Sequence, residues 1–270
     1  MNRLIRSGRL LYGTAIVALG LEHLITGNFP TALLPVPAEV PGRLVLVYAT
    51  GGALVIAGLC VVFGKKADWA ALLVAALFLL LDLVTHLPKL IANPYNGGVW
   101  TTFTELIALT GGALVIAGEL LTDFSVTRRG HFTNTYMRYG SLLYALSLII
   151  FGIQHVLYAN FVATLIPAWI PWHLFWTYLI GLAFVATAAS ILLKKQIPLS
   201  TTLLGVMFLL WVILLHIPRV IANLHHETEW TSTFIALAMS GIAFVLADFY
   251  KVNEADKIDA TTAYKSLSIR

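Results

Sequence analysis

The sequence contains little charge and almost no cysteine. Asp, Glu, Lys and Arg make up 11% of its 270 residues, whereas about 25% is usual for a soluble domain. The single cysteine, Cys60, excludes an internal disulfide, a Cys-x-x-Cys redox pair and a covalent haem attachment site. No basic patch alternates with aromatic residues in a polar region, so the formal net charge of +4 does not indicate nucleic acid binding.

Long apolar runs are what the sequence has instead. Hydrophobic residues make up 59% of the chain and form eight runs, and about 20 apolar residues are enough to cross a bilayer. Because lipid offers no hydrogen bonds to the backbone, such runs cross it as helices. The sequence therefore predicts an all-α, polytopic membrane protein with eight transmembrane helices. The runs lie at about residues 8–26, 43–63, 67–87, 100–121, 137–158, 172–193, 199–217 and 231–249.

The chain also contains an internal repeat, in which polar motifs recur at an offset of 132 and, after a shortened loop, of 130. The matching motifs are Gly20-x-x-His23 with Gly152-x-x-His155, His86-x-Pro88 with His216-x-Pro218, and Trp100-Thr101 with Trp230-Thr231. A repeat of this length indicates a tandem duplication of a four-span unit.

The repeat defines the expected domain boundaries. We expect the first repeat at residues 1–124, a cytoplasmic linker at 125–136, the second repeat at 137–250 and a polar, loosely ordered tail at 251–270. The first apolar run follows several arginines and resembles a signal peptide. Its recurrence inside the chain argues that it is the first transmembrane helix.

Basic residues predict the orientation. Fourteen of the seventeen Lys and Arg residues lie at the termini, in the linker or in the turns on the same side, and only Arg43, Lys89 and Arg219 lie opposite. By the positive-inside rule both termini face the cytoplasm. With four spans each, the two halves would be parallel and related by a pseudo-twofold axis near the membrane normal.

Polar residues within the spans gather near the outer surface. The first half places Glu22, His23, Asp82, His86 and Glu105 at one depth. Asp82 and His86 are four residues apart and share a helix face. Ionisable groups in a span cost ~2.5–3.5 kcal/mol at the centre and usually face an interior or a wet cavity. The alternative is that each histidine is an interfacial residue that satisfies a neighbouring helix.

The second half keeps only part of this set. It has Gln154, His155 and His216, with Val212 and Ile235 in place of the carboxylates. We therefore expect the first half to hold the functional site. Lys89 follows His86 by one turn and is a candidate partner for the acidic groups. Arg219 takes the matching place, and no equivalent carboxylate is expected near it.

The loops at residues 29–41 and 161–171 are apolar and rich in proline. Apolar aromatic segments at this level indicate either an anchor in the membrane interface or a lid over the polar cluster. Tyr48 and Tyr178 are typical of belt aromatics, with contact to a quinone or lipid headgroup as the alternative.

These motifs resemble the DoxX-like family of small four-span membrane proteins. The resemblance rests on Gly-x-x-His followed by Phe, as in Phe151-Gly-Ile-Gln-His155 with Phe161, on the loop Pro167-Ala-Trp-Ile-Pro171, and on His-x-Pro-[Lys/Arg]-x-Ile-Ala-Asn. It covers both halves. It implies a bacterial inner-membrane protein linked to redox complexes, because the family is named after the membrane subunit of a thiosulfate:quinone oxidoreductase. It transfers no catalytic residue.

Three functions remain open at this point. The first is an integral subunit of a quinone-linked redox system, with soluble or membrane redox partners. It would hold a headgroup near Glu22, His23, Asp82 and His86, with the histidines as hydrogen-bond donors or proton relays. The second is a binding or transport protein with a cleft between the repeats. The third is haem or metal binding by His23 and His155 across the axis.

Overall fold

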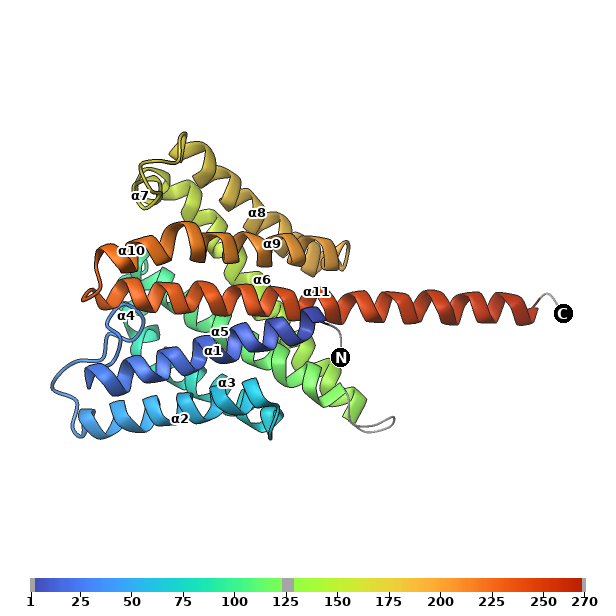
Figure 1. Ribbon diagram of the computed structural model, residues 1–270, viewed down its shortest axis with the longest axis horizontal. Coiled ribbons are helices and arrows are strands. Elements are labelled where there is room, and N and C mark those ends of the chain that lie inside the picture. The colour runs from blue at the N-terminus through green and yellow to red at the C-terminus, as the bar shows by residue number, and fades with distance from the viewer. Residues whose placement is uncertain (1–2, 123–128, 269–270) are drawn as a thin grey trace.

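The computed structural model describes residues 3–122 and 129–268, and the side chains of 4–121 and 135–252. The described backbone is helical, without strands (Figure 1). Eight helices in it are long and apolar enough to cross a membrane, which confirms the predicted spans. They are α1 (Arg3–Thr26), α2 (Arg43–Phe63), α3 (Ala67–Thr85) continued by α4 (Leu87–Ala92), α5 (Gly97–Thr122), α6 (Arg129–Leu157), α8 (His173–Leu193), α9 (Ile197–Trp211) continued by η1 (Val212–His216) and α10 (Ile217–Ala222), and α11 (Glu227–Ser268).

Local sequence explains the interruptions in the third and seventh spans. Pro88 and Pro218 lie in the first turns of α4 and α10, where a proline costs no hydrogen bond. Each proline instead limits the helix before it: α3 ends at Thr85, and α9 widens into the π-helix η1. A short helix, α7 (Ala159–Thr164), begins the loop before α8.

Two expected boundaries differ from the structure. Helix α6 begins at Arg129, inside the segment expected to be a linker, of which residues 125–128 lie outside the described part. The prediction of a loosely ordered tail was wrong for the backbone, because α11 continues to Ser268 and projects beyond the other helices (Figure 1). Apolar periodicity predicts only helices that pack one face against the bundle. The end of α11 leaves the bundle, so its sequence has no such periodicity.

The two halves are joined by two long helix–helix contacts. Helix α1 packs on α2 within its own half and on α11 of the other half. Helix α6 likewise packs on α8 and on α5 of the first half, while α5 and α11 meet at the centre. We call the α1–α11 contact the first seam and the α5–α6 contact the second seam. Each half thus packs its first span against the last span of the other.

Matched contacts occur on both sides of the molecule's centre. The hydroxyl of Tyr12 donates to the carbonyl of Leu109 at 2.9 Å, and the hydroxyl of Tyr144 donates to the carbonyl of Met239 at 2.9 Å. Both tyrosines are fully buried. These pairs recur at the offsets of the internal repeat, so equivalent residues meet equivalent partners.

Glycines bring the helices of each seam close together. A Cβ atom at Gly241 would lie 2.6 Å from the carbonyl oxygen of Gly8, across the first seam. In the second seam, a Cβ atom at Gly140 would lie 2.6 Å from the carbonyl oxygen of Gly111. Small residues that allow backbones to approach are typical of helix contacts in membranes.

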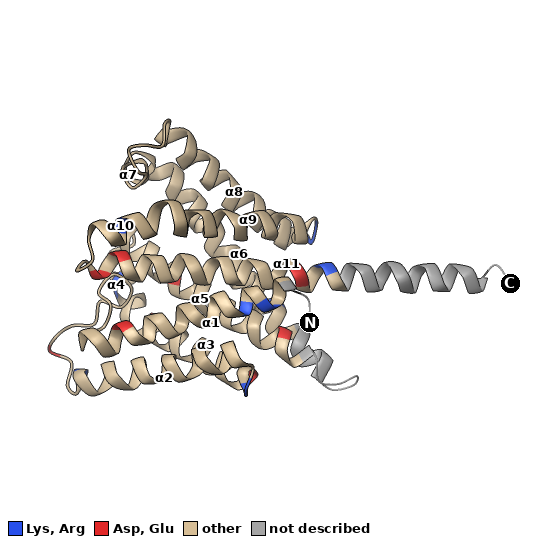
Figure 2. Cartoon of the chain, viewed as in Figure 1, with Lys and Arg blue, Asp and Glu red and all other residues tan. Residues whose placement is uncertain are grey.

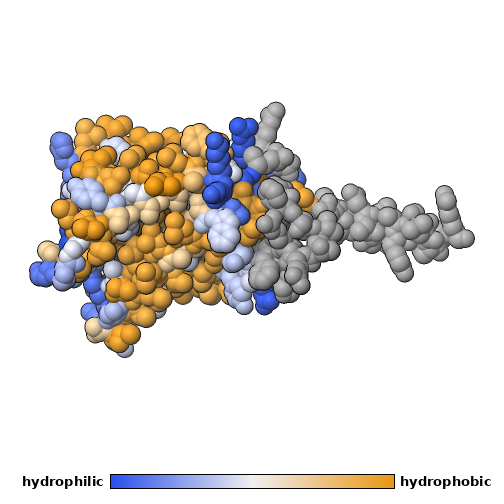
Figure 3. Space-filling view, turned by 90° about the horizontal axis from the view of Figure 1, so that it is seen from below, coloured by the Kyte–Doolittle hydropathy of each residue, from blue (hydrophilic) through white to orange (hydrophobic). Residues whose placement is uncertain are grey.

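The surface has an apolar middle and polar ends. Orange, hydrophobic residues cover the body of the molecule in Figure 3, and hydrophilic residues gather toward its two ends. The charged residues of the described chain lie near the helix ends, and both termini lie at the same end (Figures 1 and 2). This distribution is that of a bundle surrounded by lipid, with each end in contact with water.

Candidate functional site

Asp82 and His86 form a buried pair where α3 ends. Nδ1 of His86 lies 2.9 Å from Oδ1 of Asp82, and both side chains are 0% exposed. The helical spacing of four residues places them on one face, and the backbone N–H of His86 still donates to the Asp82 carbonyl. The predicted neighbourhood of Asp82 and His86 is confirmed.

The neighbours of His86 fix which of its ring nitrogens carries the proton. The Thr85 hydroxyl donates to the Leu81 carbonyl at 2.7 Å, so its oxygen can only accept from Nδ1 of His86, 3.0 Å away. Asp82 also favours a proton on Nδ1, although neither carboxylate oxygen has a well-aligned hydrogen bond with a described residue. A neutral His86 therefore presents a bare lone pair on Nε2. That atom is buried and has no partner in the described chain.

His23 on α1 has the same arrangement. Its Nδ1 lies 2.7 Å from the carbonyl oxygen of Leu19, and a carbonyl only accepts, so Nδ1 donates. Its Nε2 is also buried and without a partner among the described residues. Phe29, from the loop after α1, stands edge-on to the imidazole with ring centroids 5.6 Å apart.

The two imidazoles thus offer the same chemistry. Each is held at Nδ1 and presents Nε2 as an acceptor, the way a second partner orients a functional histidine. Such an atom accepts a hydrogen bond from a hydroxyl or binds a metal ion. No group of three or more His, Cys, Asp or Glu side chains in the described residues could hold a metal.

Glu22 does not join the Asp82–His86 pair. It faces the first seam, where Oε1 of Glu22 lies 2.6 Å from the hydroxyl of Thr231 on α11. Glu227 of α11 acts electrostatically on both Glu22 and His23. The Glu227 carboxylate also accepts hydrogen bonds from the backbone N–H and the hydroxyl of Thr31. Glu22 therefore has a hydrogen-bond partner in the other half and not in the Asp82–His86 pair.

The remaining charged candidates have other surroundings. Lys89 donates to the carbonyl of Pro35 at 3.0 Å and does not pair with the acidic groups as predicted. Arg219 forms an ion pair with Glu229 at 2.8 Å, a carboxylate that has no equivalent in the first half, where Val99 takes the matching position. Glu105 forms no hydrogen bond or ion pair with another described residue.

The second half keeps the histidines in different surroundings. Nδ1 of His155 lies 2.8 Å from the Phe151 carbonyl, and its ring stands edge-on to Phe184 of α8 at 5.2 Å. His216 ends η1 with a buried, unpartnered Nδ1. His23 and His155 each contact aromatics of their own half, on helices that pack on opposite seams. This arrangement does not favour a haem ligated by both.

The two apolar loops differ in how deeply their matching aromatic residues are buried. Phe29 in the first loop is 2% exposed, and Leu33 and Leu34 beside it are buried. That loop folds over the end of its helices next to His23. Its counterpart Phe161, on α7, is 66% exposed. The first loop is thus a cover and the second presents aromatics outward.

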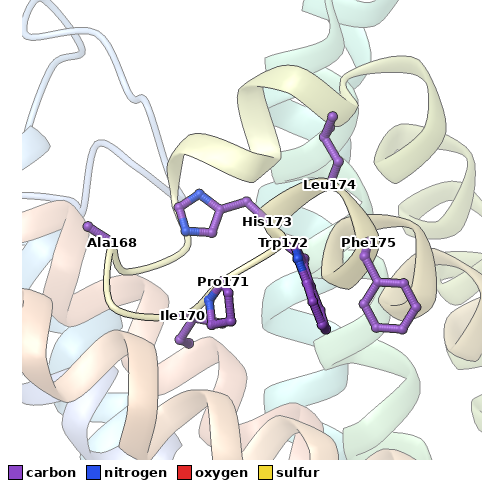
Figure 4. Close-up of a pocket in the computed structure, with 7 residues that line it drawn as sticks. All are labelled: Ala168, Ile170, Pro171, Trp172, His173, Leu174 and Phe175. Carbon is purple, nitrogen blue, oxygen red and sulfur yellow. The ribbon is translucent and has the colours of Figure 1, made fainter.

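The second loop includes a feature that periodicity does not predict. Trp172 caps α8 with φ 58°, in the left-handed region that bulky residues rarely adopt, and it is 78% exposed. It lines a shallow hollow, where its ring and that of Phe175 point to one side in the view of Figure 4 and His173 to the other. Gly42 occupies the matching position before α2, also with positive φ, so the repeat itself gives the signal.

Tyr48 and Tyr178, which the sequence predicts to be belt aromatics, lie on the surface of the bundle. Tyr48 on α2 and Tyr178 on α8 are each about half exposed and occupy equivalent positions near the helix starts. Neither tyrosine hydroxyl forms a hydrogen bond with a buried histidine of the described chain.

Comparison of the chain with protein-family models, curated protein sequences and solved structures finds no match.

Proposed function

We propose that the chain is a tandem duplication of a DoxX-like four-span unit, with two parallel halves related by a pseudo-twofold axis near the membrane normal. The matched tyrosine and glycine contacts and the two equivalent seams support this arrangement. Both termini face the cytoplasm of a bacterial inner membrane. Basic residues near the terminal end of the bundle support that orientation (Figure 2).

The function we propose is that of the integral membrane subunit of a quinone-linked redox system. It binds the headgroup near the outer leaflet, and electrons pass to or from a redox partner subunit. The single observation that carries the proposal is that two buried imidazoles, His23 and His86, each have Nδ1 held and Nε2 without a partner among the described residues.

The protonation of these imidazoles favours the reduced form of the ligand. Because Nε2 of a neutral His86 or His23 can only accept, it best binds a hydroxyl group, which a quinol has and a quinone lacks. Asp82 beside Nδ1 stabilises His86 as an imidazolium if it takes the hydroxyl proton. Apolar helices around the site suit the isoprenoid tail.

Asymmetry between the halves supports placing the site in the first. Asp82 has no equivalent, since Val212 begins the π-helix at the matching position. His216 therefore lacks a carboxylate at the preceding turn. Phe29 covers its histidine, whereas Phe161 turns outward.

Binding of a quinol to purified variants tests the proposal. His86→Ala removes an acceptor in the binding site, and we expect the affinity for a short-chain quinol to fall about tenfold, as loss of one hydrogen bond to a buried group costs about 1.5 kcal/mol. Quenching of tryptophan fluorescence during titration with the quinol measures the dissociation constant.

His216→Ala is the matched control, because it removes the equivalent imidazole from the second half. We expect the same affinity as the unaltered protein. Equal losses in both variants, with equal unfolding temperatures, would contradict a site in the first half. Tighter binding of the quinone than of the quinol would contradict the acceptor role.

A further inference from the structure

The second seam contains a complete hydrogen-bonding motif built on Gln154. Oε1 of Gln154 accepts from the hydroxyl of Thr101 at 3.3 Å, and Nε2 donates to the carbonyl of Gly97 at 3.0 Å. The Thr101 hydroxyl also lies 3.0 Å from that carbonyl. One side chain on α6 thus uses an acceptor and a donor to bind the start of α5.

The first seam repeats this motif with a carboxyl group in place of the amide. Glu22 takes the position of Gln154, Thr231 that of Thr101, and Glu227 that of Gly97. The Thr231 hydroxyl lies 2.6 Å from Oε1 of Glu22 and 3.2 Å from the Glu227 carbonyl. Oε2 of Glu22 corresponds to the donor Nε2 of Gln154, and it is buried without a hydrogen-bond partner in the described part of the chain.

The charges around Glu22 disfavour its ionised form. From α11 comes Glu227, whose carboxylate already accepts two hydrogen bonds from Thr31 and so is the better placed of the two to carry the charge. Helix α2 also packs on α1 and starts at Arg43, whose guanidinium is bound to the Asn28 side chain and lies over Phe29. On α1 itself, His23 uses Nδ1 on a carbonyl. Glu22 is 8% exposed, so water does little to stabilise a second negative charge.

We propose that Glu22 is a proton-binding site that keeps the first seam closed as a neutral carboxylic acid. A carboxylic acid has one acceptor and one donor, as an amide has, so a protonated Glu22 reproduces the motif of Gln154. Loss of that proton leaves two carboxylates, Glu22 and Glu227, against one another across α1 and α11. The first seam then responds to the pH of the outer side, while the second does not. This inference does not depend on quinol binding.

The pH dependence of thermal unfolding tests the site in the purified full chain. If the folded protein holds a proton that the unfolded chain releases, stability falls as pH rises. We expect the unfolding midpoint to fall from mildly acidic to mildly alkaline pH, and Glu22→Gln to remove most of that fall. Gln154→Glu, the reciprocal change, should add a comparable pH dependence through the second seam.

Infrared spectroscopy detects the protonation of Glu22 directly, independently of any effect of this residue on stability. The carbonyl stretch of a protonated carboxylic acid should be present at neutral pH and lose intensity in Glu22→Gln. Glu105→Gln, measured in parallel, identifies any contribution from that second carboxyl group. Loss of stability in Glu22→Gln at every pH, or an unchanged pH profile, would overturn the proposal. A further result would overturn the proposal: sodium ions that raise the unfolding midpoint of the unaltered protein but not that of Glu22→Gln. This result would show that Glu22 is a charged ligand of a cation.

Discussion

Buried tyrosine hydroxyls show how single residues hold the first and last spans of each half together. Tyr12 and Tyr144 each donate to a carbonyl on a central helix, α5 or α11, in the middle of an apolar core. Their acceptors already take part in helical hydrogen bonds, so the hydroxyl is the group that would be left unsatisfied without the contact. The aromatic ring itself fills space that phenylalanine would fill equally well.

Tyr12→Phe and Tyr144→Phe should therefore lose one hydrogen bond each and no packing. We expect each to destabilise the protein by about 1 kcal/mol. Thermal unfolding in detergent measures the shift in midpoint. Similar shifts in the two variants follow from the matched geometry, and a shift in only one would contradict it.

At the scale of elements, the seams depend on how closely two helices approach. The carbonyl of Gly8 faces Gly241 at a distance that leaves no room for a side chain. An added methyl group must push α1 and α11 apart, and overpacking of this kind typically costs about 1–3 kcal/mol.

Gly241→Ala should accordingly lower the unfolding temperature by several degrees. Gly52→Ala is the matched control, because Gly52 also lies within a helix, α2, but a Cβ atom there would meet no atom within 4 Å. We expect Gly52→Ala to be neutral or slightly stabilising, since alanine favours helices by about 1 kcal/mol over glycine. Equal effects of the two changes would show that helix propensity, not the seam, sets the cost.

How much the sequence predicts also differs from element to element. Hydropathy alone determines which segments enter lipid, so the eight spans could be predicted, and a four-residue spacing was enough to pair Asp82 with His86. The surroundings of Glu22 could not be predicted, because they depend on α1 packing against α11, more than 200 residues later. The Arg219–Glu229 pair crosses the turn between α10 and α11, where no helical periodicity relates the two positions.

On the scale of the whole molecule, the ends of the bundle define its orientation. Both termini lie at the same end of the bundle in Figure 1, and most of the described lysines and arginines lie toward that end in Figure 2. Asn96, just before α5, and Asn160, on the short helix α7 after α6, lie at the other end of the bundle. Both side chains are exposed.

Cysteine labelling tests which side is outside. In a Cys60→Ser background, Asn96→Cys and Asn160→Cys should react with a membrane-impermeant thiol reagent in intact cells. Lys65→Cys and Lys194→Cys, exposed at the other end, should react only after lysis. The reverse pattern would invert the topology and place the histidines on the cytoplasmic side.

With the proposed pseudo-twofold axis, the two seams correspond to the interface of an isologous dimer, in which each subunit presents its first helix to the last helix of its partner. In a homodimer any substitution appears at both contacts at once, because one gene encodes both copies. Fusion into a single chain removes that constraint. The two halves differ in this way at one matching position, which is Glu22 in the first half and Gln154 in the second. Two identical subunits could not differ there. Covalent linkage thus allows one contact to acquire an ionisable group while its twin remains an amide.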